Sequence, residues 1–105
     1  VDGLAHITGG GITENIVRVL PDGLGIRIDT SSWKRPEVFN WLQENGGIEE
    51  AEMLRTFNCG IGMVMLASAA AADGLARQSE AHGIACFDIG EVVTAAPDAR
   101  VEYAS

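Results

Sequence analysis

Strand-type and helix-type patterns alternate along nearly the whole of this 105-residue chain. Short apolar or alternating runs predict strands at 4–8, 24–29, 61–67 and 84–93, and an edge strand at 100–103. Apolar positions at helical spacing predict helices at 13–20, 36–46, 49–57 and 69–82. The order β-α-β-α-α-β-α-β predicts an α/β (α+β) fold, a mixed sheet with helices packed on it. A chain of this length supports one core, so we expect a single domain over 1–105.

The apolar residues indicate where the core lies. The uninterrupted run 61–67 is typical of a central strand buried on both faces, because a strand with only one buried face alternates instead. The run 84–93 predicts a further strand, bent at Gly90. Trp33 and Trp41 are expected to be packing anchors in this core.

The charge balance is acidic, with 7 Lys and Arg against 15 Asp and Glu and a formal net charge of −8. We expect no nucleic-acid partner, because neutralising phosphates requires clustered basic residues and these are scattered. No apolar stretch approaches the roughly 18 residues of a membrane span, so no membrane partner is expected either. Cys59 and Cys86 lie far apart inside apolar runs, which favours small core residues in a reducing, cytoplasmic setting over a disulfide or a zinc site.

Three consecutive glycines, Gly9, Gly10 and Gly11, stand between the first predicted strand and the first predicted helix, which Thr13 could cap. Glycines let the backbone turn tightly and approach a ligand, and the free N–H groups of a helix start attract anions, phosphate above all. The loop lacks the lysine of a phosphate-binding P-loop and the spaced glycines of a dinucleotide site. A phosphate site and a tight turn without a ligand therefore both remain open.

Three polar residues lie beside this loop or a second glycine cluster at 60–62. His6 lies on the strand that leads into the loop, on the same face as Thr8, where it could orient or protonate a substrate. The alternative is a histidine at the core edge, bonded to a backbone carbonyl. Asn15 is placed on the first helical turn, where it could reach the same space or be a solvated amide. Asn58 precedes the second cluster and is its most plausible polar participant.

Several motifs follow one another in a fixed order along the chain. They are Ala5-His6-Ile7-Thr8-Gly9-Gly10-Gly11 with Glu14-Asn15-Ile16, Asp29-x-Ser31-Ser32-Trp33, Phe39-x-Trp41-Leu42, Met53-x-Arg55-Thr56-Phe57-Asn58-x-Gly60-Ile61-Gly62-Met63 and Ile89-Gly90-Glu91-Val92. Together they resemble the phosphoribosylformylglycinamidine cyclo-ligases, also called AIR synthetases, over residues 3–93. This set of motifs is far more specific than a lone glycine loop.

The resemblance implies that 1–105 is the later part of the C-terminal domain of a longer enzyme of de novo purine biosynthesis. That enzyme closes the imidazole ring of aminoimidazole ribonucleotide from formylglycinamidine ribonucleotide. It consumes ATP with Mg²⁺, which the resemblance places mainly on an N-terminal domain that has no counterpart in this chain. The family typically forms homodimers in the cytoplasm. This piece alone is expected to be inactive.

Within that reaction, we assign the chain the substrate side. Gly9, Gly10, Gly11 and the start of the following helix are expected to bind the ribose phosphate, with Asn15 beside them. His6 is the expected catalytic residue, Asn58 is expected to line the same cleft, and no metal ligand is predicted. Two alternatives remain: another ATP-dependent enzyme of the wider superfamily, such as a selenophosphate synthetase, and a non-catalytic binding or assembly domain.

Overall fold

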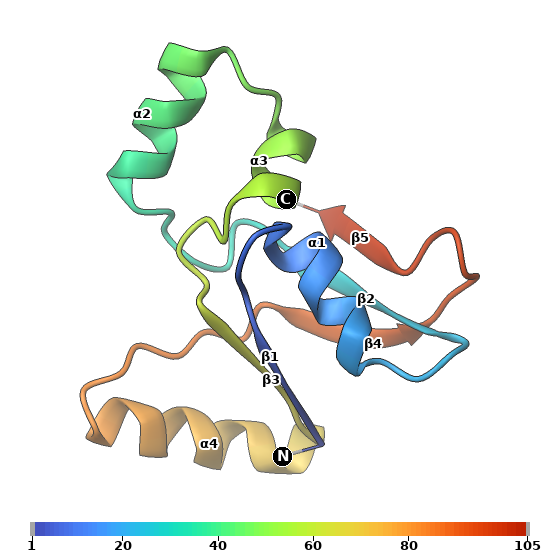
Figure 1. Ribbon diagram of the computed structural model, residues 1–105. Helices are drawn as coiled ribbons and strands as arrows, with labels where there is room; N and C mark the ends of the chain where they lie inside the picture. The colour runs from blue at the N-terminus through green and yellow to red at the C-terminus, as the bar shows by residue number, and fades with distance from the viewer. Residues whose placement is uncertain (1, 105) are drawn as a thin grey trace.

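The computed structural model describes residues 2–104 and combines helices with two small β-sheets (Figure 1). The strands are β1 (Gly3–His6), β2 (Leu24–Asp29), β3 (Met63–Leu66), β4 (Gly90–Thr94) and β5 (Val101–Ala104). The helices are α1 (Gly11–Asn15), continued by the 3₁₀ turn η1 (Ile16–Val19), then α2 (Glu37–Gly46), α3 (Glu50–Thr56) and α4 (Ala69–Ala81). This confirms the predicted mixed α+β class.

The strands form two sheets instead of the single sheet expected. In one, β1 and β3 run antiparallel, with His6 opposite Met63. In the other, the strand order is β4-β2-β5, with β2 antiparallel to β4 and parallel to β5, so this sheet is mixed as predicted. β2 matches its predicted bounds, and β5 is the edge strand that the sequence indicated.

The main core lies between the two sheets and the α1–η1 segment. Ile12 and Ile16 are fully buried there and join Ile28 of β2 and Val64 of β3. A second, smaller cluster consists of Met53 and Leu54 of α3 together with Cys59, and Phe39 of α2 packs against it. Burial alternates from Leu4 to Thr8, which leaves His6 and Thr8 exposed on one side and buries Ala5 and Ile7 on the other.

Two strand predictions are wrong in detail. The run 61–67 contains a strand of four residues that has one neighbour among the described strands, and its Met63 is 54% exposed. It is therefore an edge strand of a pair and is not buried on both faces. The strand predicted at 84–93 begins only at Gly90, because β2 ends at Asp29 and the residues before Ile89 have no strand beside them.

Two smaller expectations about side chains also fail. Trp33 is a buried anchor, but Trp41 is 61% exposed on α2, a helix with no buried residue. Thr13 does not cap the first helix, because that helix begins earlier, at Gly11, with Gly10 in the N-cap position. Cys59 is fully buried as expected, whereas Cys86 is only partly buried.

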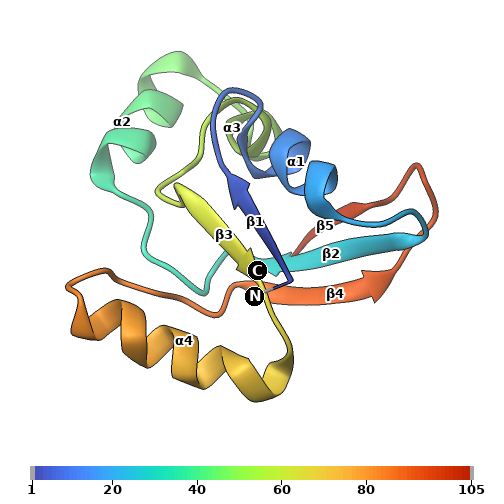
Figure 2. The same cartoon turned by 60° about the horizontal axis from the view of Figure 1, so that its bottom comes forward.

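The last helix, α4, lies apart from the sheets (Figure 2). It has 13 residues, none of them buried. Although it is the longest helix in the part of the chain that the structure describes, neither it nor any other helix there has the length and apolar character to cross a membrane.

Candidate functional site

The glycine loop turns the chain from β1 into α1. Ile7 N donates to Gly62 O at 2.9 Å, the last contact before the chain leaves the strand pair. Gly11 N then donates to Thr8 O at 3.0 Å and closes the turn. Gly10 has φ +96°, in the left-handed region where a side chain would be strained. The predicted strand–loop–helix arrangement is therefore present.

Asn15 holds the inner side of this loop. Its side chain is 4% exposed, and Nδ2 donates to Gly11 O at 2.7 Å and to Thr8 O and Gly9 O at 3.3 Å. Its Oδ1 accepts from the Thr8 hydroxyl at 3.4 Å. The amide therefore faces the loop's own carbonyls and not the solvent. A solvated amide, the alternative considered for Asn15, does not fit this geometry.

With these carbonyls turned inward, the loop presents N–H groups on its other side. Among residues 2–104, the amides of Gly9, Gly10, Ile12 and Thr13 have no hydrogen-bond partner. Successive unpaired N–H groups at a helix start make a concave surface that suits an anion. The loop thus has the donors that phosphate binding requires.

The three glycines differ in the space around them. Gly9 is exposed, and an added Cβ would meet nothing within 4 Å. Gly11 is buried against α3, where an added Cβ would lie 2.6 Å from Phe57 O. At Gly10 an added Cβ would lie 2.8 Å from Glu14 Cβ and against the Glu14 carboxylate. Gly9 therefore faces the open side of the loop, Gly11 its packed side, and the Glu14 carboxylate lies close to Gly10.

Glu14 was not singled out by the sequence reasoning. It lies one helical turn after Gly10, a spacing that brings two residues to the same side of a helix, so this neighbour could have been found. Its carboxylate brings negative charge to the site and would oppose a bound phosphate unless the side chain rotates away.

His6 lies on the exposed side of β1, opposite Met63 and two residues before the loop begins. Its ring makes no hydrogen bond within the described range 2–104, so it is not the carbonyl-bonded histidine considered as the alternative. The ring is accessible to a molecule on this side of the strand pair.

Asn58 begins a tight turn beside the loop. Ile61 N donates to Asn58 O at 3.0 Å, and Asn58 Oδ1 accepts from Gly60 N at 2.8 Å. The two central residues, Cys59 and Gly60, both have positive φ, of 53° and 101°. Such a turn suits glycine but strains cysteine. The turn adjoins the loop through Phe57, whose carbonyl faces Gly11, whereas the side-chain amide of Asn58 is used within the turn itself.

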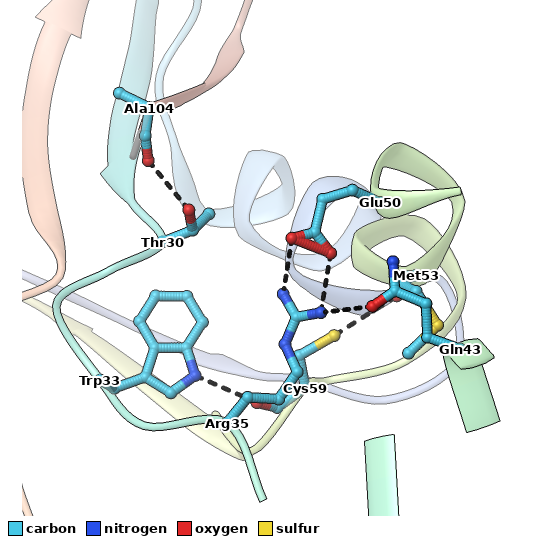
Figure 3. A network of polar contacts seen from close by, with 8 residues as sticks. All are labelled: Thr30, Trp33, Arg35, Gln43, Glu50, Met53, Cys59 and Ala104. Atoms are coloured by element: carbon cyan, nitrogen blue, oxygen red, sulfur yellow. Dashed lines mark hydrogen bonds and ion pairs between the residues drawn. The ribbon is translucent and has the colours of Figure 1, made fainter. Parts of the chain in front are cut away.

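Polar contacts around the Cys59 turn hold it in place (Figure 3). Trp33 Nε1 donates to Cys59 O at 3.0 Å, and the Cys59 thiol donates to Met53 O at 3.5 Å. Burial raises the pKa of the Cys59 thiol, although the nearby Arg35 partly opposes this. The thiol is thus a packed group and not a nucleophile.

Arg35 forms the charged part of the same network. Its guanidinium, with a side chain 13% exposed, binds Glu50 through two hydrogen bonds of 2.7 and 3.2 Å. The hydrogen bond to Glu50 raises the pKa of Arg35. Figure 3 shows how this pair, with Gln43 beside it, connects the segment before α2 to α3. Sequence reasoning missed the pair because its members are 15 positions apart, a spacing that no local pattern identifies.

The helix α1 also contacts β5 and α3 through Thr13. The Thr13 and Tyr103 hydroxyls are 2.7 Å apart, and Thr13 Oγ1 also donates to Leu54 O at 3.3 Å. Burial raises the pKa of Tyr103. A shallow hollow of about 470 Å³ opens here, lined by Thr13, Arg55 and Arg100 among others. Arg100 is already used in the fold, since its guanidinium donates to the carbonyls of Leu20 and Pro21, which precede β2, and of Leu24, the first residue of β2.

Metal binding has no support within residues 2–104, where no group of three or more His, Cys, Asp or Glu side chains lies close enough to hold an ion. The described residues thus offer no such cluster for the Mg²⁺ that the resemblance implies.

Comparison with known proteins gives one consistent family. The model described as "AIR synthase related protein, C-terminal domain" matches residues 1–102. Curated phosphoribosylformylglycinamidine cyclo-ligases from Xanthomonas campestris pv. campestris (strain B100) and Xanthomonas oryzae pv. oryzae (strain PXO99A) are each 54% identical over 101 residues. One from Xanthomonas euvesicatoria pv. vesicatoria (strain 85-10) is 52% identical over the same length. Each match covers 96% of this chain but 30% of the relative, so the chain spans less than a third of these proteins. The resemblance inferred from the motifs is confirmed.

Proposed function

This chain belongs to the family of AIR synthase related proteins, in their C-terminal domain, and on that premise we propose that it is the substrate-binding part of a phosphoribosylformylglycinamidine cyclo-ligase. Residues 1–105 form the later part of that domain. The full-length enzyme converts formylglycinamidine ribonucleotide and ATP into aminoimidazole ribonucleotide, ADP and phosphate, acts in the cytoplasm and forms a homodimer. These last features are inferred from the resemblance.

The observation that carries the proposal is the glycine loop with its carbonyls bound by Asn15. Asn15 binds the carbonyls of Thr8, Gly9 and Gly11. Because C=O and N–H point in opposite directions across a planar trans peptide, the N–H groups of Gly9, Gly10 and Ile12 point away from Asn15. The ribose phosphate binds to these N–H groups. In a chain with a net charge of −8, backbone donors supply the positive potential that few basic side chains provide.

Asn15 and His6 have different roles in this proposal. Asn15 is a positioning residue, because its amide contacts the loop and not the open side. His6, exposed on β1 next to the loop, orients the substrate or carries a proton to or from it. Asn58 shapes the neighbouring wall of the cleft through its turn.

ATP and Mg²⁺ are assigned to polypeptide outside this chain. The described side chains include no cluster suited to Mg²⁺, and we derive no step through either group here. What this chain contributes is the binding and orientation of the ribonucleotide, which places its reacting atoms for ring closure.

The test uses a chimera, the X. campestris relative carrying this chain in place of its own matched residues. Gly9→Leu fills the open side of the loop without strain in the fold, because nothing lies within 4 Å of an added Cβ. The KM for the ribonucleotide should rise about tenfold or more, equivalent to about 1.4 kcal/mol of lost binding. The control is Gly74→Leu on α4, which is equally open and far from the loop in sequence. Equal KM values for the two variants would contradict the phosphate role.

Glu14 gives an independent check of the same proposal. Glu14→Gln removes the negative charge beside Gly10 and should lower the KM for the ribonucleotide, because a carboxylate at this position repels phosphate. Glu44→Gln, an exposed change on α2, serves as the control. A KM that is unchanged or higher for Glu14→Gln would place the phosphate elsewhere.

A further inference from the structure

The strand β5 runs beside α1 and is joined to it by the side chains of Tyr103 and Thr13, which we call the hydroxyl pair (Figure 1). Their oxygens are 2.7 Å apart, and Thr13 Oγ1 also donates to Leu54 O at 3.3 Å. A threonine hydroxyl has one hydrogen, and the bond to Leu54 O uses it. Within the hydroxyl pair, Tyr103 is therefore the donor and Thr13 the acceptor. Three elements, β5, α1 and α3, are joined at this point.

The bond from Thr13 serves a carbonyl at the end of α3. The last carbonyls of an α-helix receive no N–H from their own helix. Phe57 N donates to Met53 O at 2.9 Å and closes the final turn. Leu54 O instead faces the start of α1, where it would be the nearest atom to a Cβ added at Gly11. Thr13 thus holds the first turn of α1 against the end of α3.

Tyr103 is firmly placed for its contact with Thr13. Among the partly buried residues that the structure describes, it is the only one that packs against both hydrophobic clusters. On the parallel pair β2–β5 it is matched with Ile28, which is fully buried. Burial raises the pKa of Tyr103, so its hydroxyl keeps the proton that it donates to Thr13. The ring is fixed by the core and the hydroxyl faces α1.

The turn that the hydroxyl pair holds carries part of the candidate phosphate site. The amides of Ile12 and Thr13 have no hydrogen-bond partner among residues 2–104. Each amide belongs to a planar peptide group, so a side chain of the same turn that is bonded on two sides limits how far these groups rotate. Donors that are already oriented spare the cost of ordering them when a ligand binds.

We propose that Tyr103 is a positioning residue for the substrate phosphate, acting through the Thr13 hydroxyl on the backbone donors at the start of α1. The inference rests on the proposed function of the glycine loop. Tyr103 does not touch the substrate, so its contribution is to binding and not to ring closure. The family model matches residues 1–102, and Tyr103 therefore lies outside the pattern on which the family assignment rests.

Steady-state kinetics of the chimera defined above test this role. Tyr103→Phe keeps the ring in both clusters and removes only the hydroxyl. The KM for the ribonucleotide should rise about fivefold, equivalent to about 1 kcal/mol, the usual net contribution of one hydrogen bond. The kcat should not change, because the interaction is lost equally from the ground state and the transition state. A lower kcat at an unchanged KM would overturn the proposal.

Thr30→Val is the matched control. The Thr30 hydroxyl donates to Ala104 O of the same strand at 3.0 Å, so its removal loosens β5 without touching α1. The KM of this variant should equal that of the unmodified chimera. All KM values are measured below the unfolding temperature of the least stable variant. An equal rise in KM for Thr30→Val and Tyr103→Phe would assign the effect to the strand as a whole and overturn the role of Tyr103.

Variants of Thr13 show whether Tyr103 acts through this residue. Thr13→Val keeps the shape and removes the hydroxyl, so KM should rise at least as much as in Tyr103→Phe. Thr13→Ser restores the hydroxyl and should recover most of that loss. Adding Tyr103→Phe to Thr13→Val should raise KM no further, because the acceptor is already absent. Two fold-changes that multiply in the double variant would overturn the proposal.

Gly9→Leu separates a failure of this inference from a failure of the proposed function. A KM that rises for Gly9→Leu but not for Tyr103→Phe would overturn the role of Tyr103 and leave the phosphate role of the loop standing. A KM that is unchanged in both variants would overturn the phosphate role and this inference with it.

Discussion

Replacing Asn15 by leucine should lower the free energy of unfolding of this chain by about 2–3 kcal/mol. Leucine has the same branched arrangement of side-chain heavy atoms, so the change removes the amide without opening a cavity. The amide nitrogen loses one hydrogen bond of 2.7 Å and two of 3.3 Å, all to loop carbonyls, and the amide oxygen loses one of 3.4 Å from the Thr8 hydroxyl. Each buried hydrogen bond contributes about 1 kcal/mol net, and carbonyls left unpaired at a buried position add a further cost.

Thermal and urea unfolding measure this effect, followed by the fluorescence of the buried Trp33. For a domain of about this size, the loss corresponds to a fall in Tm of roughly 10–20 °C. The control is Asn45→Leu, because Asn45 donates to Trp41 O at 2.9 Å but is exposed on α2. That change should cost no more than about 0.5 kcal/mol. Similar costs for the two variants would refute the idea that the Asn15 amide holds the loop.

A second substitution separates the amide's hydrogen bonds from its shape. Asn15→Asp keeps the shape but directs carboxylate oxygens at the carbonyls of Thr8, Gly9 and Gly11. The folded state then disfavours the ionised form, which raises the folded-state pKa of the new carboxyl above its ordinary value near 3.9. A raised folded pKa gives stability that is present at low pH and lost as pH rises. The deficit relative to the unmodified chain should therefore shrink from pH 7 to pH 5, whereas that of Asn15→Leu should not.

Three further predictions concern other groups of the fold. Tyr103 is the single tyrosine, so absorbance near 295 nm should report a titration midpoint above its ordinary pKa of about 10. Stability should fall as pH rises past 10, and Tyr103→Phe should remove that part of the fall. Iodoacetamide at pH 7.5 should label Cys86 in the native chain and Cys59 only after unfolding, because Cys59 is fully buried and burial raises the pKa of its thiol. Peptide mass spectrometry measures the labelling, and label on Cys59 in the native chain would contradict this prediction. Glu50→Gln should lower the free energy of unfolding by about 1–2 kcal/mol, because Arg35 then keeps a mostly buried charge without its partner. Glu44→Gln is the control, and equal urea midpoints for the two variants would contradict this prediction.

Sequence reasoning succeeded where the determinants of structure are local. β2 was predicted at its observed bounds because apolar residues alternate between turn residues on both sides. The connection from β1 through the glycines to α1 was predicted from residue types that only such a turn favours. The helix α4 was predicted to within one residue at its C-terminal end, since Gly83 follows it with positive φ.

The failures concern long-range packing. The run 61–67 is apolar enough for a central strand, yet β3 has a single neighbour, and composition alone cannot supply the second. Trp41, exposed on α2, similarly shows a hydrophobic side chain that no described element covers.

The role of Asn15 depends on both a local pattern and long-range packing. Its position four residues after Gly11 is one at which a short polar side chain can bond a backbone carbonyl of the preceding turn. That signal was available, but spacing does not tell whether the amide turns inward or toward solvent. The direction is decided by burial, since Asn15 is 4% exposed and its bond to Gly11 O, beside which α3 packs, lies in the interior.

The two walls of the candidate phosphate site are connected through the β1–β3 pair. The glycine loop leaves β1 just after His6, and the Asn58 turn enters β3 just before Met63, the residue opposite His6. Both walls of the candidate site therefore extend from one end of a two-stranded pair, an element that is marginal without further support. The isolated chain has every loop donor but would have to order this pair on binding, and that cost lowers affinity. Phosphate should for this reason bind more weakly to the isolated chain than to the chimera.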